Sequence, residues 1–230
     1  LGVRIFPGAP LIKELYMKLF VRFLIFIFFA TEMSLSSEKI NIFNFNDNDL
    51  TKFKSHSIKK KTNYSIIKEN GESYLKAEAE GQASGLGREI KVDLNKTPFL
   101  NITWKVEQGI PGIKENSKKG HDFAARVSVI KEIGSLPWQK KAMNYVFSSN
   151  EKTNSHWMGP YRKQIIDYVA SSLVDSKENS WVTVKLNVKE HFKKFLDLDL
   201  AEIDGVAIMT DTDNTKQKAV SYYKNIYFSN

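Results

Sequence analysis

The sequence predicts an all-β protein, an antiparallel β-sandwich of the jelly-roll type with one short helix. Apolar residues alternate with polar ones along many short segments, and clusters of Gly, Asn and Pro separate these segments. One short stretch alone has helical spacing. Alternation with a period of two is typical of strands that bury one face, as in antiparallel sheets. Many strands with few helices favour a sandwich.

The alternation is clearest in residues 73–80, 99–106 and 181–188. In the second of these segments, Trp104 and Val106 lie on the apolar face, so we expect both in the core. Further strands are expected at residues 40–45, 64–68, 88–94, 123–131, 143–148, 165–171, 206–210 and 221–228.

The predicted helix covers residues 188–196, where Phe192, Phe195 and Leu196 share one side. No linker of low complexity interrupts residues 37–230. We therefore expect this segment to fold as a single β-sandwich domain.

The first forty residues have the layout of a secretory signal peptide. Lys18 and Arg22 follow Met17 and supply a basic region, and an unbroken apolar run then covers residues 23–30. Small and polar residues come next, and cleavage after Ser36 fits their pattern. The sequence thus predicts a periplasmic or exported protein.

Three segments follow from this interpretation. Residues 1–16 are expected to result from a mis-called start, residues 17–36 to be the signal peptide, and residues 37–230 to be the domain. In the alternative interpretation, residues 19–29 are a buried helix or an uncleaved anchor. The apolar run is short for a membrane span, so we expect no stable membrane insertion after signal cleavage.

Composition excludes several classes of site. The chain has no cysteine, which excludes disulfides, thiolate metal sites, a cysteine nucleophile and a lipoprotein anchor. The formal net charge is +8, but the lysines are scattered along the chain. A solvated surface explains this pattern better than a nucleic-acid interface, so no nucleic-acid partner is expected.

Several segments, taken in order, resemble a family of exported bacterial proteins, domain of unknown function 3047. These are residues 77–79, 84–86, 104–106, 122–127, 144–146, 181, 208–215 and 222–228, with the run at 208–215 the most specific. The chain departs from the family pattern at Lys216, where Gly is usual, and at Lys224-Asn225, where Gly-Asp is usual. A role for a terminal aspartate is therefore in doubt. The family implies no activity. More distantly, the pattern is similar to galactose-binding-like and carbohydrate-binding-module jelly rolls.

Arg126 is a candidate ligand-binding residue. It lies on the polar face of its expected strand between small side chains, which leaves space above the guanidinium for a carboxylate or sulfate. Asp122 precedes it and is a candidate partner or ligand contact, and Lys105 is a further basic candidate. The alternative is that Arg126 forms a structural pair with an acidic side chain.

The aromatic residues Trp138, Trp157 and Tyr161 lie in the middle of the chain, near Gly and Pro residues. Aromatic rings of this kind stack on the C–H faces of sugars, which makes the three residues candidates for carbohydrate binding. The alternative is that they close one end of the sandwich.

Asp211, Asp213 and Asn214 are candidate calcium ligands, because hard cations prefer several oxygen ligands. The spacing matches no known calcium loop. The preferred interpretation is a tight turn in which these side chains bond nearby backbone amides.

The function we expect is non-catalytic binding of a carbohydrate or another envelope polymer, including acidic polymers. No catalytic motif can be recognised, and no catalytic residue is assigned. One alternative is a polysaccharide lyase or hydrolase that uses Arg126 with His121 or Tyr145. Another is an envelope assembly factor that binds a protein.

Overall fold

The computed structural model describes residue 2 and residues 38–46, 50–136 and 139–230. The expected signal peptide, its boundaries and Trp138 lie outside the described residues. Residues 38–230 form one compact unit. Within the described residues, no helix is long and apolar enough to cross a membrane.

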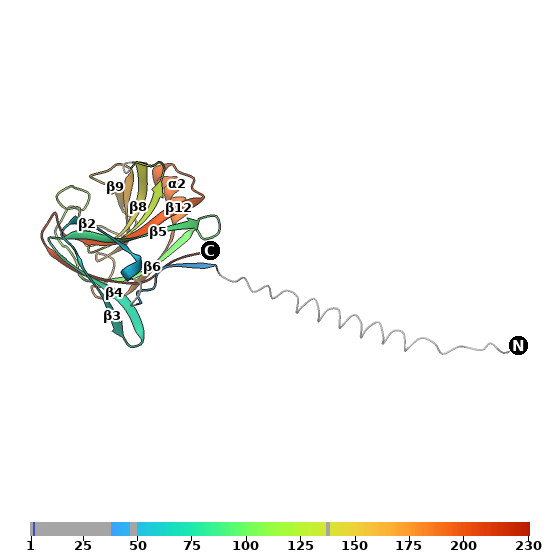
Figure 1. Ribbon diagram of the computed structural model, residues 1–230, viewed down its shortest axis with the longest axis horizontal. Helices are drawn as coiled ribbons and strands as arrows, with labels where there is room; N and C mark the ends of the chain where they lie inside the picture. The colour runs from blue at the N-terminus through green and yellow to red at the C-terminus, as the bar shows by residue number, and fades with distance from the viewer. Residues whose placement is uncertain (1, 3–37, 47–49, 137–138) are drawn as a thin grey trace. The chain divides into compact units, whose positions relative to one another are not determined.

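Two β-sheets pack against each other in the described part of the chain (Figure 1). The six-stranded sheet has the spatial order β11 (Val182–Asn187), β6 (Phe99–Gln108), β13 (Lys218–Ser229), β4 (Glu72–Glu80) and β3 (Asn63–Glu69), with β1 (Lys39–Phe43) also paired to β13. The seven-stranded sheet has the order β2 (Lys54–Lys59), β5 (Ala83–Asp93), β12 (Glu202–Asp211), β7 (Ala125–Glu132), β8 (Lys140–Ser148), β10 (Ile165–Ser172) and β9 (His156–Met158). The β-sandwich class is therefore confirmed.

The expected strands all form, and the structure adds features that the alternation did not predict. The sequence pattern missed two strands. All six residues of β2 are exposed, so it has no buried apolar face to produce alternation, and β9 is only three residues long. β5 begins at Ala83, five residues before the predicted start at Arg88. The alternation did not reveal this first part of the strand, because Gly85 and Gly87 interrupt the pattern. β8 and β10 pair in parallel, which is a departure from the antiparallel arrangement that we expected. The chain passes through β9 between them, and β9 pairs with the far edge of β10.

The core lies between the two sheets. Trp104 and Val106 on β6 are fully buried, as predicted. The indole Nε1 of Trp104 donates a hydrogen bond to Ser171 Oγ on β10, at 2.9 Å, and its ring packs on Phe147 of β8. This contact joins strands of the two sheets, so Trp104 provides both apolar burial and a satisfied polar group.

The predicted helix is α2 (Val188–Leu196). Asn187 caps its first turn by accepting a hydrogen bond from the backbone N–H of Glu190 at 3.1 Å. Val188 and Phe192 are buried, so the helix covers one margin of the core. A short 3-10 helix, η1 (Leu50–Lys52), follows β1.

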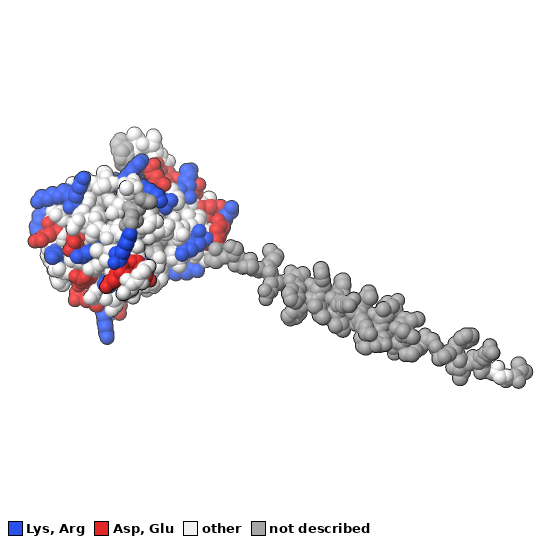
Figure 2. Space-filling view, turned by 60° about the horizontal axis from the view of Figure 1, so that its bottom comes forward, with Lys and Arg blue, Asp and Glu red and all other residues white. Residues whose placement is uncertain are grey.

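Charged side chains of both signs are interspersed over the face of the protein that Figure 2 shows. The basic residues on this face do not gather into one patch, which agrees with the scattered lysines of the sequence. A binding surface for a strongly charged polymer needs an extended area of one charge sign. The face in Figure 2 has no such area.

Candidate functional site

The outer face of the seven-stranded sheet carries two neighbouring rows of residues, each set by the strand register. One row crosses every strand and consists of Lys54, Gly87, Ala207, Ser128, Asn144, Asp167 and Trp157. The next row consists of His56, Gly85, Met209, Arg126, Val146 and Val169. In the first row, small residues thus occupy β5 and β12, and polar residues follow on β7, β8 and β10. In the second row, Met209 and Arg126 lie side by side, and apolar Val146 and Val169 follow.

This arrangement leaves a groove over β2, β5, β12 and β7. It contains two hollows of about 390 and 560 Å³ that share His56, Ile58 and Met209 in their linings, so they form one continuous depression. Gly85 helps to keep the floor low: a Cβ atom there would lie 3.0 Å from the carbonyl oxygen of Ile208. The larger hollow, here called the end pocket, lies beside Arg126 and Tyr161.

Arg126 is paired inside the end pocket. Its Nη2 donates to both carboxylate oxygens of Asp211, each at 2.8 Å, and both side chains are buried. Burial alone would lower the pKa of Arg126, but the charges of Asp211 and Asp167 outweigh this and raise it, so the guanidinium stays charged. Burial raises the pKa of Asp211 to about 6, against the opposing effect of Arg126, which leaves its carboxylate ionised at neutral pH.

The open space that we expected above Arg126 is therefore partly filled by Asp211. The guanidinium also lies 4.8 Å from the centre of the Phe123 ring. Donors are nevertheless left over: within the described part of the chain, neither Nε nor Nη1 forms a hydrogen bond, and Nε is buried. Nε has almost no accessible surface, so a ligand atom cannot reach it, whereas Nη1 is not buried and is the donor that an external acceptor can contact.

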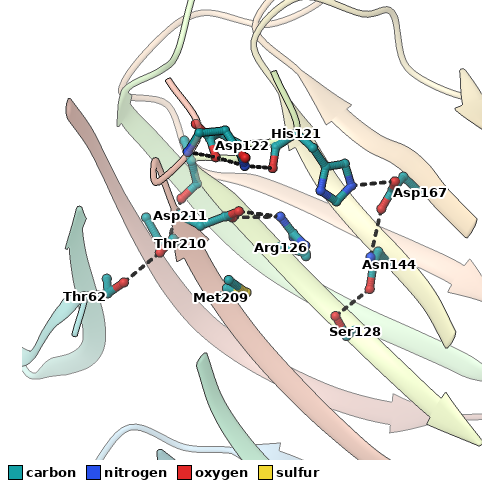
Figure 3. A network of polar contacts seen from close by, with 12 residues as sticks. Thr62, His121, Asp122, Arg126, Ser128, Asn144, Asp167, Met209, Thr210 and Asp211 are labelled. Atoms are coloured by element: carbon teal, nitrogen blue, oxygen red, sulfur yellow. Dashed lines mark hydrogen bonds and ion pairs between the residues drawn. The ribbon is translucent and has the colours of Figure 1, made fainter. Parts of the chain in front are cut away.

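A second polar network lies on the other side of Arg126 (Figure 3). His121 Nε2 is 2.9 Å from Asp167 Oδ2, and Asn144 Nδ2 donates to Asp167 Oδ1 at 2.8 Å. Ser128 then donates to Asn144 Oδ1 at 2.6 Å. Burial of Asp167 raises its pKa, but hydrogen bonds from His121 and Asn144 and the charges of His121 and Arg126 lower it below its ordinary value overall.

The ionised Asp167 carboxylate fixes the ring of His121, because the Nε2–H must donate to it. In the neutral form of His121, Nδ1 is then the proton-accepting nitrogen, and in Figure 3 it lies on the side of Arg126. Since His121 lines the end pocket, the arrangement offers a ligand an oriented acceptor beside a guanidinium donor. The same pair has the geometry of an oriented general base.

Asp122 does not pair with Arg126. Its carboxylate accepts hydrogen bonds from the backbone N–H groups of Asn214 and Thr215 and from their side chains. Asp122 therefore holds the turn after β12. The expectation that Asp211 bonds nearby backbone amides was wrong, because Asp211 instead contacts Arg126 across the sheet.

The candidate calcium ligands lie close together but are mostly occupied. Carboxylate oxygens of Asp122, Asp211 and Asp213 lie within 4.8 Å of one another. However, Arg126 neutralises Asp211, and hydrogen bonds occupy both oxygens of Asp122. The Asn214 amide donates to Asp122 and accepts from Tyr161. A calcium ion prefers six to eight oxygens, and this set offers few free ones.

The aromatic candidates separate in space. Tyr161 lines the end pocket and is 56% exposed, with its hydroxyl 2.7 Å from the carbonyl oxygen of Lys118. Trp157 is half-buried and packs on Phe123, so it covers a small apolar cluster on the outer face rather than offering a free ring. Trp138 lies outside the described residues.

Lys105 lies on the outer face of the other sheet, away from Arg126. Its Nζ is 4.3 Å from the centre of the Tyr222 ring and 5.4 Å from that of Trp181. Tyr74 packs edge-on against both rings. These aromatic residues form a second cluster, here called the six-stranded-sheet patch, in which Trp181 is exposed, Tyr74 is half-buried and Tyr222 is buried. Arg126, Lys105 and the aromatic candidates thus do not line one concavity.

Sequence reasoning missed Asp167, Asn144 and the glycine floor of the groove. A signal for Asp167 was present, since it is a lone charge inside the apolar strand at residues 165–170. Gly85 and Gly87 alternate in a strand, a pattern that indicates close approach of another chain or ligand.

Comparisons with solved structures found distant likenesses. One is the family 30 carbohydrate-binding module of a cellulosomal cellulase of Clostridium thermocellum, at 10% identity and a TM-score of 0.48, covering 83% of this chain and 96% of that one. A second family 30 carbohydrate-binding module has 10% identity, a TM-score of 0.46 and coverage of 84% and 87%. The glycoside hydrolase domain of Endo-D from Streptococcus pneumoniae R6 has 9% identity, a TM-score of 0.40 and coverage of 77% and 21%. At these values the likenesses carry no argument about a ligand.

A comparison with curated protein sequences found no significant match. Segments that carry the sequence resemblance meet at the end pocket, namely residues 122–127, 144–146 and 208–215. The profile of the family described as protein of unknown function (DUF3047) matches residues 49–227, which is most of the chain. The chain therefore belongs to the DUF3047 family.

Proposed function

We propose that this protein binds a neutral carbohydrate polymer along the groove of the seven-stranded sheet. The observation that carries the proposal is the continuous depression over β2, β5, β12 and β7, which ends in a rigid pocket of donors and acceptors. The small side chains of the floor leave room for a chain of rings. Apolar atoms of Ile58, Ile130 and Met209 line the same groove and suit the C–H faces of sugars.

The polar groups of the end pocket suit hydroxyl groups. Each sugar hydroxyl both donates and accepts a hydrogen bond. Arg126 offers donors, while His121 Nδ1 and the Asp213 carboxylate are acceptors with no hydrogen-bond partner among the described residues. Asp211 holds the side chain of Arg126 in place, and Asp167 holds that of His121. Binding would therefore cost little side-chain entropy.

Charge favours a neutral ligand over the acidic polymer that the sequence suggested. The lining of the end pocket contains Arg126 and Arg162 against Asp211 and Asp213, so its formal charge is zero. Asp122 and Asp167, which contact lining residues, add negative charge, and Lys216 and Lys118, which contact Asp213 and Tyr161, add as much positive charge. Because Asp211 already balances Arg126, an anionic ligand would bring an unbalanced negative charge close to Asp213.

The test is co-sedimentation with insoluble polysaccharides such as cellulose, chitin and peptidoglycan. Ala207 is half-buried in the groove floor, so Ala207→Trp should fill the groove without disturbing the core. Its control is Thr103→Trp, on the outer face of β6. We expect Ala207→Trp to weaken binding about tenfold or more, and Thr103→Trp to leave it unchanged. Equal binding by both variants, or no binding by the parent protein, would overturn the proposal.

A second candidate function is turnover of the same polymer, and the His121–Asp167 pair is the observation that favours it. An oriented histidine can act as a general base in hydrolysis or elimination. Tyr145, the other base considered from the sequence, is buried in the core and is not available. Release of soluble sugar fragments that is lost in Asp167→Asn would support an enzyme.

We propose further that the protein acts in the periplasm or outside the cell, after removal of residues 17–36. The basic and apolar pattern of that segment supports this placement. Mass spectrometry of the exported protein should find a mature N-terminus near Ser37. A mature protein that begins upstream of Met17 would contradict the proposal.

A further inference from the structure

Three features of the end pocket go beyond what the binding of hydroxyl groups requires. Arg126 is nine-tenths buried, and its Nη1 has no hydrogen-bond partner in the described residues. Asp213 has a carboxylate without a hydrogen-bond partner in the described residues, on the same pocket wall. Apolar side chains also line the pocket, among them Met209 and Ile165.

The leftover donors of Arg126 call for an acceptor that is stronger than a hydroxyl oxygen. Carboxylate and carbonyl oxygens are such acceptors. Asp211 already balances the charge of Arg126, so a second carboxylate would lie unbalanced beside Asp211 and Asp213. A neutral carbonyl oxygen satisfies the guanidinium without this repulsion.

Asp213 supplies the complementary acceptor. A carboxylate oxygen of Asp213 lies within 4.8 Å of one of Asp211, and Asp211 is 2.8 Å from Arg126 Nη2. The guanidinium of Arg126 and the carboxylate of Asp213 therefore both lie next to Asp211, close enough for one small ligand group to contact both. A secondary amide presents its C=O and its N–H on opposite sides, and so matches this pair.

We infer that the end pocket binds the acetamido group of an N-acetylated amino sugar. The carbonyl oxygen accepts from Arg126, the amide N–H donates to Asp213, and the methyl group lies against Met209. This inference rests on the proposed function, because it names the sugar that the groove would hold. It predicts preference for neutral polymers of N-acetylhexosamine, such as chitin.

The experiment is calorimetric titration with three oligosaccharides of equal length. They are tetra-N-acetylchitotetraose, here called chitotetraose, its fully de-N-acetylated form, and cellotetraose. The three differ at the C2 substituent, which is acetamido, ammonium or hydroxyl. We expect chitotetraose to bind about tenfold or more tightly than cellotetraose, since the other ligands leave Arg126 without its carbonyl acceptor.

The matched variant is Asp213→Asn, which keeps the shape of the side chain but removes the carboxylate. It should reduce the preference for chitotetraose over cellotetraose about tenfold. Binding of cellotetraose should fall less, because the amide oxygen of Asn still accepts from a hydroxyl group. Asp213 lies in the turn at residues 212–216 outside the core, so this variant avoids the unfolding that a change at Arg126 risks.

The outcomes separate the two proposals. Equal binding of chitotetraose and cellotetraose, both lost in Ala207→Trp, would overturn the acetamido site and leave the groove intact. Preference for the ammonium form would overturn it as well. Binding of none of the three ligands by the folded protein would overturn the acetamido site, and failure with the insoluble polymers would then remove the groove proposal too. Preference for chitotetraose that persists in Asp213→Asn would contradict the assigned role of Asp213.

Discussion

Arg126 Nη2 lies 2.8 Å from both carboxylate oxygens of Asp211, and neither side chain is more than 8% exposed. The pair links β7 to the end of β12 across the outer face of the seven-stranded sheet. The sequence indicated that Arg126 would matter for ligand binding rather than for stability. Its burial with Asp211 means that stability must depend on it as well.

Removing one partner of this pair should be strongly destabilising. Arg126→Met leaves the Asp211 carboxylate buried without its cation, and we expect the free energy of unfolding to fall by about 3–5 kcal/mol. Chemical denaturation monitored by tryptophan fluorescence would measure this. The control is Lys54→Met, which breaks the exposed Lys54–Glu89 pair and should leave the midpoint in place. An Arg126→Met protein with the parent midpoint would show that the pair is not a stabilising contact.

Trp104 should be the most sensitive core position on β6. Trp104→Ala removes a fully buried side chain, and the expected loss is about 3–5 kcal/mol. Ser171→Ala leaves the indole N–H without its acceptor and should reduce stability by about 1–3 kcal/mol. Denaturation midpoints of the two variants and the parent test both values. If Ser171→Ala were neutral, the hydrogen bond would not be a buried structural contact.

The pH dependence of stability should contain a contribution from His191. Burial lowers the pKa of His191, which packs 4.6 Å from Tyr168 and lies near the Tyr145 hydroxyl. In the unfolded chain a histidine titrates near 6.5. As pH falls below that value, the unfolded chain gains the proton first, so stability should fall until the folded pKa is passed.

Melting temperatures between pH 7.5 and about pH 5 would measure this contribution. His191→Gln should flatten the decline, whereas His56→Gln, at an exposed position on β2, should keep it. An identical pH profile for the parent and His191→Gln would show that His191 does not couple to folding.

Calcium should not stabilise the folded protein. The carboxylates of Asp122 and Asp211 are already occupied by hydrogen-bond donors and by Arg126. A ligand that binds only the folded state raises the melting temperature, so adding calcium or a chelator should have no effect. A calcium-dependent rise that disappears in Asp213→Asn would reverse our interpretation of this loop.

Local pattern was enough to predict most of the strands, because alternation records which side of a strand is buried. It placed Trp104 in the core, and it placed Arg126 on the opposite face of β7. It also found the helix at residues 188–196, which has a capping Asn187 and a buried Phe192. These features depend on neighbours in sequence.

The site depends on which strands pair, and local pattern does not contain that information. Asn144 and Asp167 meet because β8 and β10 pair in parallel, and Met209 faces Arg126 because β12 lies beside β7. The partner of Arg126 is 85 residues away along the chain. Lys105 carried a plausible charge but belongs to the other sheet, which sequence spacing could not reveal.

The central claim is that the carbohydrate lies on the outer face of the seven-stranded sheet. The most direct test is a nuclear magnetic resonance titration of the protein with chitotetraose, following backbone amide shifts. We predict that perturbed amides cluster at Gly85, Gly87, Ala207 and Met209, along the groove. Shifts confined to the six-stranded-sheet patch, around Trp181, would contradict it and move the binding surface to the opposite sheet.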